Sequence, residues 1–344
     1  MKATVFHEQG ENAALHVAEM PQPQPGPTDV VVAVRACGVN RLDIYSRTGR
    51  TKIAPIPHIS GSEVAGEITA IGEAVSGLST GQRVAVAPYL FCGQCEFCRA
   101  GEEVLCLKGD IVGLGNQGGF AEYIRVPASS IVPLPQNVDF SAAAAIGLAA
   151  ITAWHMLTRR APLRPGQDVL VHAAGSGVGS AAIQIAKLHG ARVITTVGSD
   201  EKRDQARSLG ADEVINYRTH DFSQEIRRIT NKRGVDVVVE HVGADSWEKS
   251  IASLARHGRL VTCGATTGNE GKVNIWNLFA KEQTLIGSYG GTRQDLAEVL
   301  KLVANGQFQP VIHGTYTLEQ VDEAQRLMEG REQFGKLIVV PGIY

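Results

Sequence analysis

The sequence carries little net charge and no long apolar run. Its formal net charge is −2 over 344 residues, which gives no electrostatic reason to expect nucleic acid or an anionic membrane surface as a partner. The longest apolar run, residues 142–151, is too short to span a bilayer. The N-terminus, MKATVFHEQG, lacks the apolar centre of a signal peptide. We therefore expect a globular chain of about two domains, located in the cytoplasm.

Four of the six cysteines lie close together in the sequence. They follow the pattern Cys-x2-Cys-x2-Cys-x7-Cys and are Cys92, Cys95, Cys98 and Cys106. In a reducing compartment such clustering favours a metal site over disulfides. Four thiolates on one short loop can enclose Zn²⁺ in a tetrahedron that has no open position. The pattern therefore predicts one structural zinc ion rather than a catalytic one.

The stretch 168–202 has the pattern of a dinucleotide-binding unit. A short apolar run is followed by a turn of small residues at 174–179, a segment with helical spacing at 182–188 and a second apolar run at 193–197. Small residues let the backbone approach phosphates, and a helix N-terminus offers free N–H groups and the positive end of its dipole. The stretch therefore predicts a site for the pyrophosphate of a dinucleotide.

The two parts of the chain differ in their secondary-structure pattern. The first 130 residues are expected to be rich in strands, at 30–36, 64–70 and 83–87 among others, with Gly and Pro turns between them. An Ala-rich helix over 141–157 comes next. After it we expect six short strands, mostly separated by helices, at 168–172, 192–197, 213–215, 235–240, 258–263 and 283–287. This alternation is typical of an α/β, doubly wound six-stranded parallel sheet. A helix over 294–305 and a strand over 336–340, which could return to the first domain, complete the expected elements.

Together these features resemble the medium-chain dehydrogenase/reductase superfamily over essentially the whole chain. The four-cysteine loop resembles the structural zinc lobe of its alcohol dehydrogenases, whereas residues 37–49 and the turn 173–179 are similar to its quinone oxidoreductase branch. The resemblance implies a GroES-like, β-rich catalytic domain over 1–148 and 289–344, with the zinc lobe at about 90–108, and a Rossmann domain over 149–288. It also implies a homodimer or homotetramer.

The catalytic zinc motif of the alcohol dehydrogenases is incomplete in this sequence. Those enzymes bind catalytic zinc with a Cys, a His inside Gly-His-Glu, and a later Cys or carboxylate. Cys37 matches the first position, Ser62 replaces the His, and the third position falls near Leu148. One thiolate and one hydroxyl make a poor zinc site, so we expect no catalytic zinc. His58, four residues before Ser62, is an alternative ligand.

Without a metal ion, other groups must polarise the substrate. By resemblance to the quinone oxidoreductase branch, Asn40 and Tyr45 match positions that face the nicotinamide cleft. An amide N–H and a phenol O–H can polarise a carbonyl oxygen, and the phenol can donate a proton. Asp43 is expected to orient the backbone or Arg47. The alternative for Tyr45 is a packed aromatic residue with a solvated tip.

The end of the second strand of the dinucleotide unit predicts the coenzyme. NAD enzymes usually have Asp or Glu there to hold the ribose 2′-OH, but the position is Val197 here. Ser199 and Lys202 follow and offer hydrogen bonds and a cation to a 2′-phosphate, which favours NADP(H), whereas Asp200 would partly restore use of NADH. The resemblance implies further coenzyme contacts at Tyr217, Thr152, Ser176, Gly177, Val178, Val242 and Gly264.

These features favour an NADPH-dependent reductase that transfers hydride to a small molecule, a quinone or another activated enone or carbonyl, without catalytic zinc. Tyr45 or water would supply the proton. One alternative is a zinc-dependent alcohol dehydrogenase with unusual ligands. The other is an NADPH-binding structural or regulatory protein that has no enzymatic activity.

Overall fold

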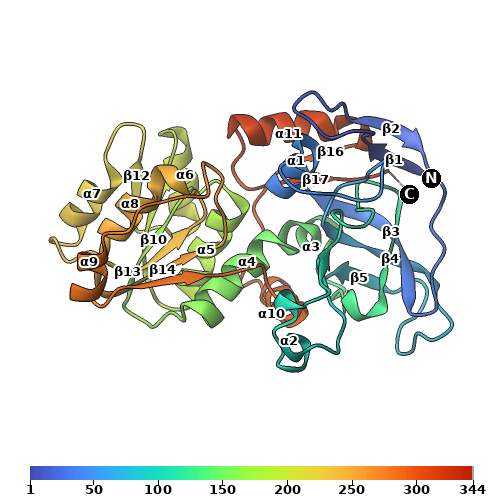
Figure 1. Ribbon diagram of the computed structural model, residues 1–344, viewed down its shortest axis with the longest axis horizontal. Coiled ribbons are helices and arrows are strands. Elements are labelled where there is room, and N and C mark those ends of the chain that lie inside the picture. Colours follow the sequence, from blue (N-terminus) through green and yellow to red (C-terminus); the bar gives the residue numbers. More distant parts are fainter. Residues whose placement is uncertain (343–344) are drawn as a thin grey trace. The chain divides into compact units, whose positions relative to one another are not determined.

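The chain forms two compact units in the computed structural model, which describes residues 1–342. The first unit contains Met1–Ile151 together with the segment from Gly291 onward, and the second contains Thr152–Gly290. In Figure 1 the blue N-terminal elements and the red C-terminal elements therefore belong to one unit, whereas most of the green, yellow and light orange elements belong to the other.

The second unit is built on a parallel sheet of six strands in the order β12-β11-β10-β13-β14-β15. This is the doubly wound order of dinucleotide-binding folds, so the predicted α/β architecture is confirmed. The strands are β10 (Asp168–Val171), β11 (Arg192–Val197), β12 (Glu213–Asn216), β13 (Val235–Glu240), β14 (Leu254–Thr262) and β15 (Thr284–Gly287). The helices are α5 (Gly177–Leu188), α6 (Glu201–Ser208), α7 (Phe222–Ile229), α8 (Ala244–Ala252) and α9 (Ile275–Ala280).

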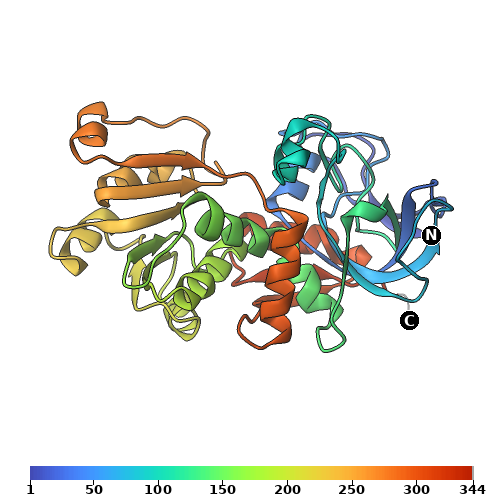
Figure 2. The same cartoon turned by 90° about the horizontal axis from the view of Figure 1, so that it is seen from below.

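Apolar runs explain why these strands occupy the centre of their unit. Leu170, Ile194, Val238 and Leu260 are fully buried in one hydrophobic cluster, as expected for strands covered on both faces. Strand β14 begins at Leu254 rather than at the expected residue 258, because an irregular register lets its first residue pair with Val235 before the regular pairing starts. Figure 2 shows α9 on the long connection between β14 and β15.

The first unit is built on a mostly antiparallel sheet in the order β16-β17-β3-β4-β5-β9, with β8 also paired to β3. Strand β17 pairs antiparallel with β3 at Ile338 and Gly38, so the predicted return of the C-terminal strand to the first part of the chain is confirmed.

The sheet strands are β3 (Asp29–Gly38), β4 (Glu63–Ile71), β5 (Arg83–Val86), β8 (Tyr123–Pro127), β9 (Ile131–Pro133), β16 (Ile312–Tyr316) and β17 (Lys336–Val339). Two small pairs are β1 (Lys2–Val5) with β2 (His16–Glu19) and β6 (Tyr89–Leu90) with β7 (Asp110–Ile111). The helices are α1 (Arg41–Thr48), α2 (Glu96–Arg99), α3 (Phe140–Ile146), α10 (Arg293–Ala304) and α11 (Val321–Gly330).

The single helix predicted over 141–157 is wrong. The segment forms α3, then α4 (Ala149–His155), which continues into a π-helical turn at Met156–Arg160. The break is stabilised by Glu63, whose Oε1 accepts hydrogen bonds from the N–H groups of Leu148 at 2.6 Å and Ala149 at 2.8 Å. A carboxylate there satisfies free N–H groups at the start of α4 and interacts favourably with its dipole. Within residues 1–342 no single helix is long and apolar enough to cross a membrane, and only the bent pair of α3 with the helix that follows has that length and composition.

Candidate functional site

The four predicted zinc ligands come together in the first unit. Their Sγ atoms all lie within 4.8 Å of one another, with separations of 3.4 Å for Cys95–Cys98, 3.9 Å for Cys95–Cys106 and 4.0 Å for Cys92–Cys98. A tetrahedron with Zn–S bonds of about 2.3 Å has sulfur atoms roughly 3.8 Å apart. The cluster therefore fits a zinc ion held by four thiolates, which leaves no open position for a substrate. In the described part of the chain, no other set of three or more His, Cys, Asp or Glu side chains converges in this way.

Helix α1 begins at the predicted catalytic segment. Asn40 is its N-cap residue in an extended conformation, and Asp43 lies in the first turn. Asp43 accepts hydrogen bonds from the backbone N–H of Asn40 at 2.7 Å and of Gly61 at 3.0 Å. Arg47 instead binds side chains of α11. Of the two roles predicted for Asp43, the structure shows the contact with the backbone and not the one with Arg47.

Asp43 is buried, and its carboxylate oxygens are hydrogen-bonded to backbone N–H groups. Burial raises the pKa of Asp43 to about 7, while the N–H group of Asn40, the charge of Lys336 and the N–H group of Gly61 lower it. Because its oxygens are committed to backbone donors, Asp43 holds the start of α1 and the loop at Gly61 in place.

Tyr45 lies further along α1 and is half-buried. The guanidinium carbon of Arg50 lies 5.1 Å from the centre of its ring, within the range of a cation–π contact. Its hydroxyl group forms no hydrogen bond with any other part of residues 1–342. A phenol in this state is able to bind a substrate oxygen or to donate a proton. A packed aromatic residue with a solvated tip would have the same exposure, so a substitution must separate the two interpretations.

The three positions that the sequence analysis assigned to catalytic zinc offer only one thiol among them. Cys37 is fully buried in the hydrophobic core, and a Cβ atom at Gly61 or Gly119 would lie only 2.8 or 2.9 Å from its Sγ atom. Burial raises the pKa of the Cys37 thiol well above its usual range. Ser62 is also buried, and Leu148 offers an apolar side chain. One enclosed thiol therefore remains where zinc needs at least three ligands.

His58 does not supply the missing ligand. Its Nδ1 lies 3.2 Å from the carbonyl oxygen of Pro55, and its Nε2 lies 2.9 Å from the carbonyl oxygen of Gly113. Burial lowers the pKa of His58. Because both ring nitrogens face backbone carbonyls, neither is directed to Cys37, and the alternative of His58 as a replacement ligand is not supported by this geometry.

Lys336 is a buried charged residue that the sequence did not single out. It begins β17 and is only 4% exposed. Its Nζ atom donates to the carbonyl oxygen of Val39 and to Oδ1 of Asn40, each at 2.7 Å, and forms an ion pair with Glu63 at 2.7 Å. A lysine at the start of an otherwise apolar strand is usually the solvated end of that strand, so only the tertiary structure could reveal this contact.

The predicted phosphate-binding turn begins helix α5 of the second unit. Ser176 is the N-cap residue of α5, and its Oγ accepts a hydrogen bond from the N–H of Gly179 at 2.8 Å. A Cβ atom at Gly179 would lie 2.2 Å from the carbonyl oxygen of Ala173, so the helix can pack on the strand only with glycine there. The free N–H groups of the first turn of α5 fit a pyrophosphate. Ala174 and Ser176 stand at two positions where dinucleotide-binding turns usually have glycine. Ala174 is buried, and Ser176 caps the helix.

Most of the predicted coenzyme contacts lie at the carboxyl ends of the parallel strands. Ser176, Gly177 and Val178 follow β10, Ser199 and Lys202 follow β11, Tyr217 follows β12, Val242 follows β13, and Gly264 follows β14. The carboxyl ends of parallel strands share one edge of a sheet, where such folds bind ligands. Thr152 is different because it belongs to α4.

Val197 is buried at the end of β11 where NAD enzymes usually have an acidic residue. Next to it, a Cβ atom at Gly198 would lie 2.8 Å from the hydroxyl oxygen of Tyr217, so this phenol lies against the loop. Asp200, the residue expected to oppose a 2′-phosphate, is hydrogen-bonded to Asn216 and Arg203, each at 3.2 Å. Its carboxylate is therefore partly neutralised by protein groups.

A buried hydrogen-bond network, which the sequence did not indicate, supports the loop after β13. Glu240 accepts hydrogen bonds from the N–H of Val242 at 2.6 Å and from the hydroxyl groups of Ser246 at 2.9 Å and Ser250 at 2.7 Å. His172 contacts the hydroxyl group of Ser250 at 2.8 Å. Burial lowers the pKa of His172 to about 4. The network thus fixes the backbone around the predicted coenzyme contact at Val242.

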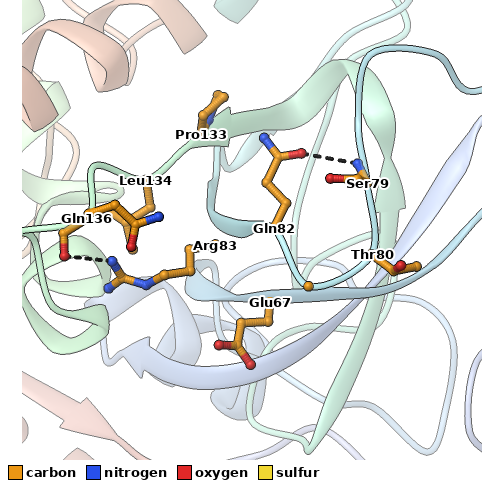
Figure 3. Close-up of a pocket in the computed structure, with 9 residues that line it drawn as sticks. Glu67, Ser79, Thr80, Gln82, Arg83, Pro133, Leu134 and Gln136 are labelled. Atoms are coloured by element: carbon orange, nitrogen blue, oxygen red, sulfur yellow. Dashed lines mark hydrogen bonds between the residues drawn. The ribbon is translucent and has the colours of Figure 1, made fainter.

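The first unit also has a surface depression, which is lined by none of the site residues described above. Figure 3 shows that it is lined by side chains such as Gln82, Arg83 and Gln136. The guanidinium group of Arg83 donates to the carbonyl oxygens of Pro135, Gln136 and Val138. Because its charged groups are engaged within the protein, we assign no function to it.

Comparison with known proteins agrees with this architecture. Residues 26–136 match the model of the alcohol dehydrogenase GroES-like domain, and residues 177–305 match that of the zinc-binding dehydrogenases. The acryloyl-coenzyme A reductase of Metallosphaera sedula is 31% identical, with 98% of this chain and 99% of that protein covered. The human quinone oxidoreductase is 30% identical, with 99% and 98% covered. A crystal structure of an NAD-dependent alcohol dehydrogenase is 42% identical with a TM-score of 0.95, over 99% of this chain and 100% of that one.

This similarity covers 98–99% of the chain, and the second matched segment begins within the predicted phosphate-binding turn, at Gly177. The chain therefore belongs to the medium-chain dehydrogenase/reductase superfamily and is an oxidoreductase that depends on a nicotinamide coenzyme.

Proposed function

We propose that the protein is an NADPH-dependent reductase of quinones or other activated enones and carbonyls that works without catalytic zinc. The observation that carries this proposal is the predicted reaction site of the first unit. Its Tyr45 hydroxyl group has no hydrogen-bond partner in the described part of the chain, and two of the three predicted zinc positions lack a zinc-binding side chain. When bound, a nicotinamide coenzyme supplies a hydride. Asn40 and Tyr45 would bind the substrate oxygen, and Tyr45 or water would give a proton to the reduced product.

Two relatives support this substrate class by their names. The human protein is called a quinone oxidoreductase and the Metallosphaera protein an acryloyl-coenzyme A reductase. Both names describe the reduction of an electron-poor unsaturated substrate. In such a substrate, a hydrogen bond to the carbonyl oxygen stabilises the negative charge that forms as hydride arrives.

A zinc-dependent alcohol dehydrogenase remains the second candidate. It is favoured by the likeness to the structure named as an NAD-dependent alcohol dehydrogenase. The ligand set opposes it, because Ser62 and Leu148 cannot replace His and Cys as zinc ligands. Zinc content separates the two candidates, since we expect about one zinc ion per chain for the four-cysteine cluster and two for a zinc-dependent alcohol dehydrogenase.

The decisive experiment is a panel of quinones, enones and alcohols assayed with NADPH and NADH. We expect oxidation of NADPH by a quinone or an enone, with Cys37→Ser retaining most of that activity, because a buried thiol in the core takes no part in the reaction. If only alcohols are converted, or if Cys37→Ser abolishes turnover in folded protein, the zinc-free reductase is excluded. If the coenzyme binds but no quinone, enone or alcohol is converted, the result favours the alternative of an NADPH-binding structural or regulatory protein.

NADPH is expected to bind more tightly than NADH, and Lys202 to carry much of the difference. Lys202→Ala should weaken NADPH binding roughly tenfold or more and leave NADH binding nearly unchanged, because a charge-assisted contact to phosphate is worth about 1.5–3 kcal/mol. Fluorescence titration with both coenzymes measures this effect. The exposed Lys232→Ala variant removes the same charge elsewhere and serves as the control. Equal affinity of the unmodified protein for both coenzymes would refute the preference.

We also propose that the chain works as a homodimer or homotetramer in the cytoplasm. The zinc cluster fits a reducing compartment, since its four thiols must stay unoxidised to bind metal. Strand β15 lies at an edge of the six-stranded sheet, and Ile275, Trp276 and Phe279 of the preceding helix are more than half exposed. Unpaired strand edges and apolar patches are typical of protein interfaces. A monomer mass by light scattering would contradict this assembly.

A further inference from the structure

We propose that Lys336 is a positioning residue of the reaction site, whose ammonium group fixes the orientation of the Asn40 amide. The amide then presents its N–H side to the substrate oxygen. This inference rests on the proposed function, in which Asn40 polarises that oxygen.

The ammonium group of Lys336 is restrained by three buried contacts. Its Nζ atom donates hydrogen bonds of 2.7 Å to the carbonyl oxygen of Val39 and to Oδ1 of Asn40. It also lies 2.7 Å from Oε2 of Glu63, with which it forms an ion pair but no hydrogen bond. The side chains of Lys336 and Glu63 are 5% and 0% exposed, so water does not compete for these positions. Two hydrogen bonds and one buried ion pair therefore hold the ammonium group against Asn40.

A lysine in this position decides which way the amide points. The oxygen and nitrogen of an asparagine amide have nearly the same shape, and their placement follows from their hydrogen-bond partners. An ammonium group only donates, so Oδ1 must face Lys336 and Nδ2 must face away from it. Nδ2 reaches the carbonyl oxygen of Gly38 only at 3.4 Å. At least one of its two N–H groups thus remains available to a substrate.

The position of Lys336 is fixed in turn by Glu63. One oxygen of Glu63 pairs with Lys336, and the other accepts the N–H groups of Leu148 and Ala149 at the start of α4. The start of α4 therefore positions the carboxylate of Glu63. That carboxylate positions the ammonium group of Lys336, which in turn orients the amide of Asn40. If Lys336 were absent, the amide could rotate and present its oxygen, which repels a carbonyl oxygen.

The test compares Lys336→Met with Lys336→Arg and with Asn40→Ala in a double-mutant cycle. Lys336→Met should lower kcat up to about 100-fold, as a misplaced contact to the reacting group can, with little change in the KM for coenzyme. Lys336→Arg keeps a donor-only cation and should restore most of kcat. In the Asn40→Ala background, Lys336→Met should change kcat less than about twofold, because the group that it positions is gone. Additive losses would overturn the proposal.

A double variant and a measurement of amide exchange test the proposal if Lys336→Met unfolds or if no substrate is found. Lys336→Met leaves Glu63 without its cation, so the double variant Lys336→Met/Glu63→Gln provides a folded protein if the single variant unfolds. In protein with ¹⁵N-labelled asparagine side chains, the NMR signals of the Asn40 amide are assigned by their loss in Asn40→Ala. They should exchange slowly with water in the unmodified protein and faster without Lys336. Unchanged exchange would overturn the inference even if no substrate is found, whereas an inactive protein with the expected exchange would refute only the proposed function.

Discussion

Tyr45→Phe is expected to lower kcat by about 10²–10⁴-fold if the phenol supplies the proton to the product, because this is the usual contribution of a general acid. The loss should be smaller if water is the donor. The structure supports a large effect, since the hydroxyl group has no hydrogen-bond partner in the described part of the chain and its removal leaves nothing unpaired within the protein. Folding stability should therefore stay nearly unchanged.

Steady-state rates with NADPH and a quinone measure this effect, and thermal unfolding checks that the variant is folded. Tyr123→Phe, on β8 of the same unit, removes a phenol hydroxyl from another half-buried tyrosine and serves as the matched control. If Tyr45→Phe and Tyr123→Phe turn over equally fast, Tyr45 is a packed aromatic residue and not a catalytic one.

Cys98→Ser should remove the zinc ion and destabilise the first unit, while the protein that still folds keeps its turnover. Four thiolates hold a structural zinc ion with an apparent free energy of about 10–16 kcal/mol in isolated zinc fingers, so loss of one ligand is among the most damaging changes available to this chain. The ion contributes no chemistry, because the four sulfur atoms leave no open position on it.

Zinc analysis and thermal unfolding of the purified variant measure this effect. Cys263→Ser changes a cysteine outside the cluster and should leave the zinc content unchanged. A soluble Cys98→Ser protein that keeps its thermal midpoint and loses only its turnover would show that the zinc ion is catalytic.

The parts of the fold that the sequence could predict are those encoded by local pattern. Six apolar runs predicted the six strands of the second unit, and the spacing of Cys92 to Cys106 predicted a cluster whose sulfur separations suit zinc. The turn at Gly179 was equally predictable, because a small residue there is required by the close approach of helix and strand.

The parts that could not be predicted depend on residues far apart in the chain. No signal in the Ala-rich segment marks the helix break before Ala149, because the group that stabilises it is Glu63. The contact of Lys336 with Asn40 joins residues 296 positions apart and exists only after β17 has paired with β3. His58 could be proposed as a metal ligand from its position in the sequence, but not rejected without the two carbonyls that face its ring.

The pairing of β17 with β3 has a consequence for the order of events during synthesis. The second unit is continuous in the chain and can fold once its last strand has left the ribosome, since domains generally fold as units. The first unit cannot, because the strand that begins with Lys336 is made after the whole of the second unit. The nascent protein can therefore complete its coenzyme-binding unit before its reaction site, and Asn40 has no contact with its cation until Lys336 has been made.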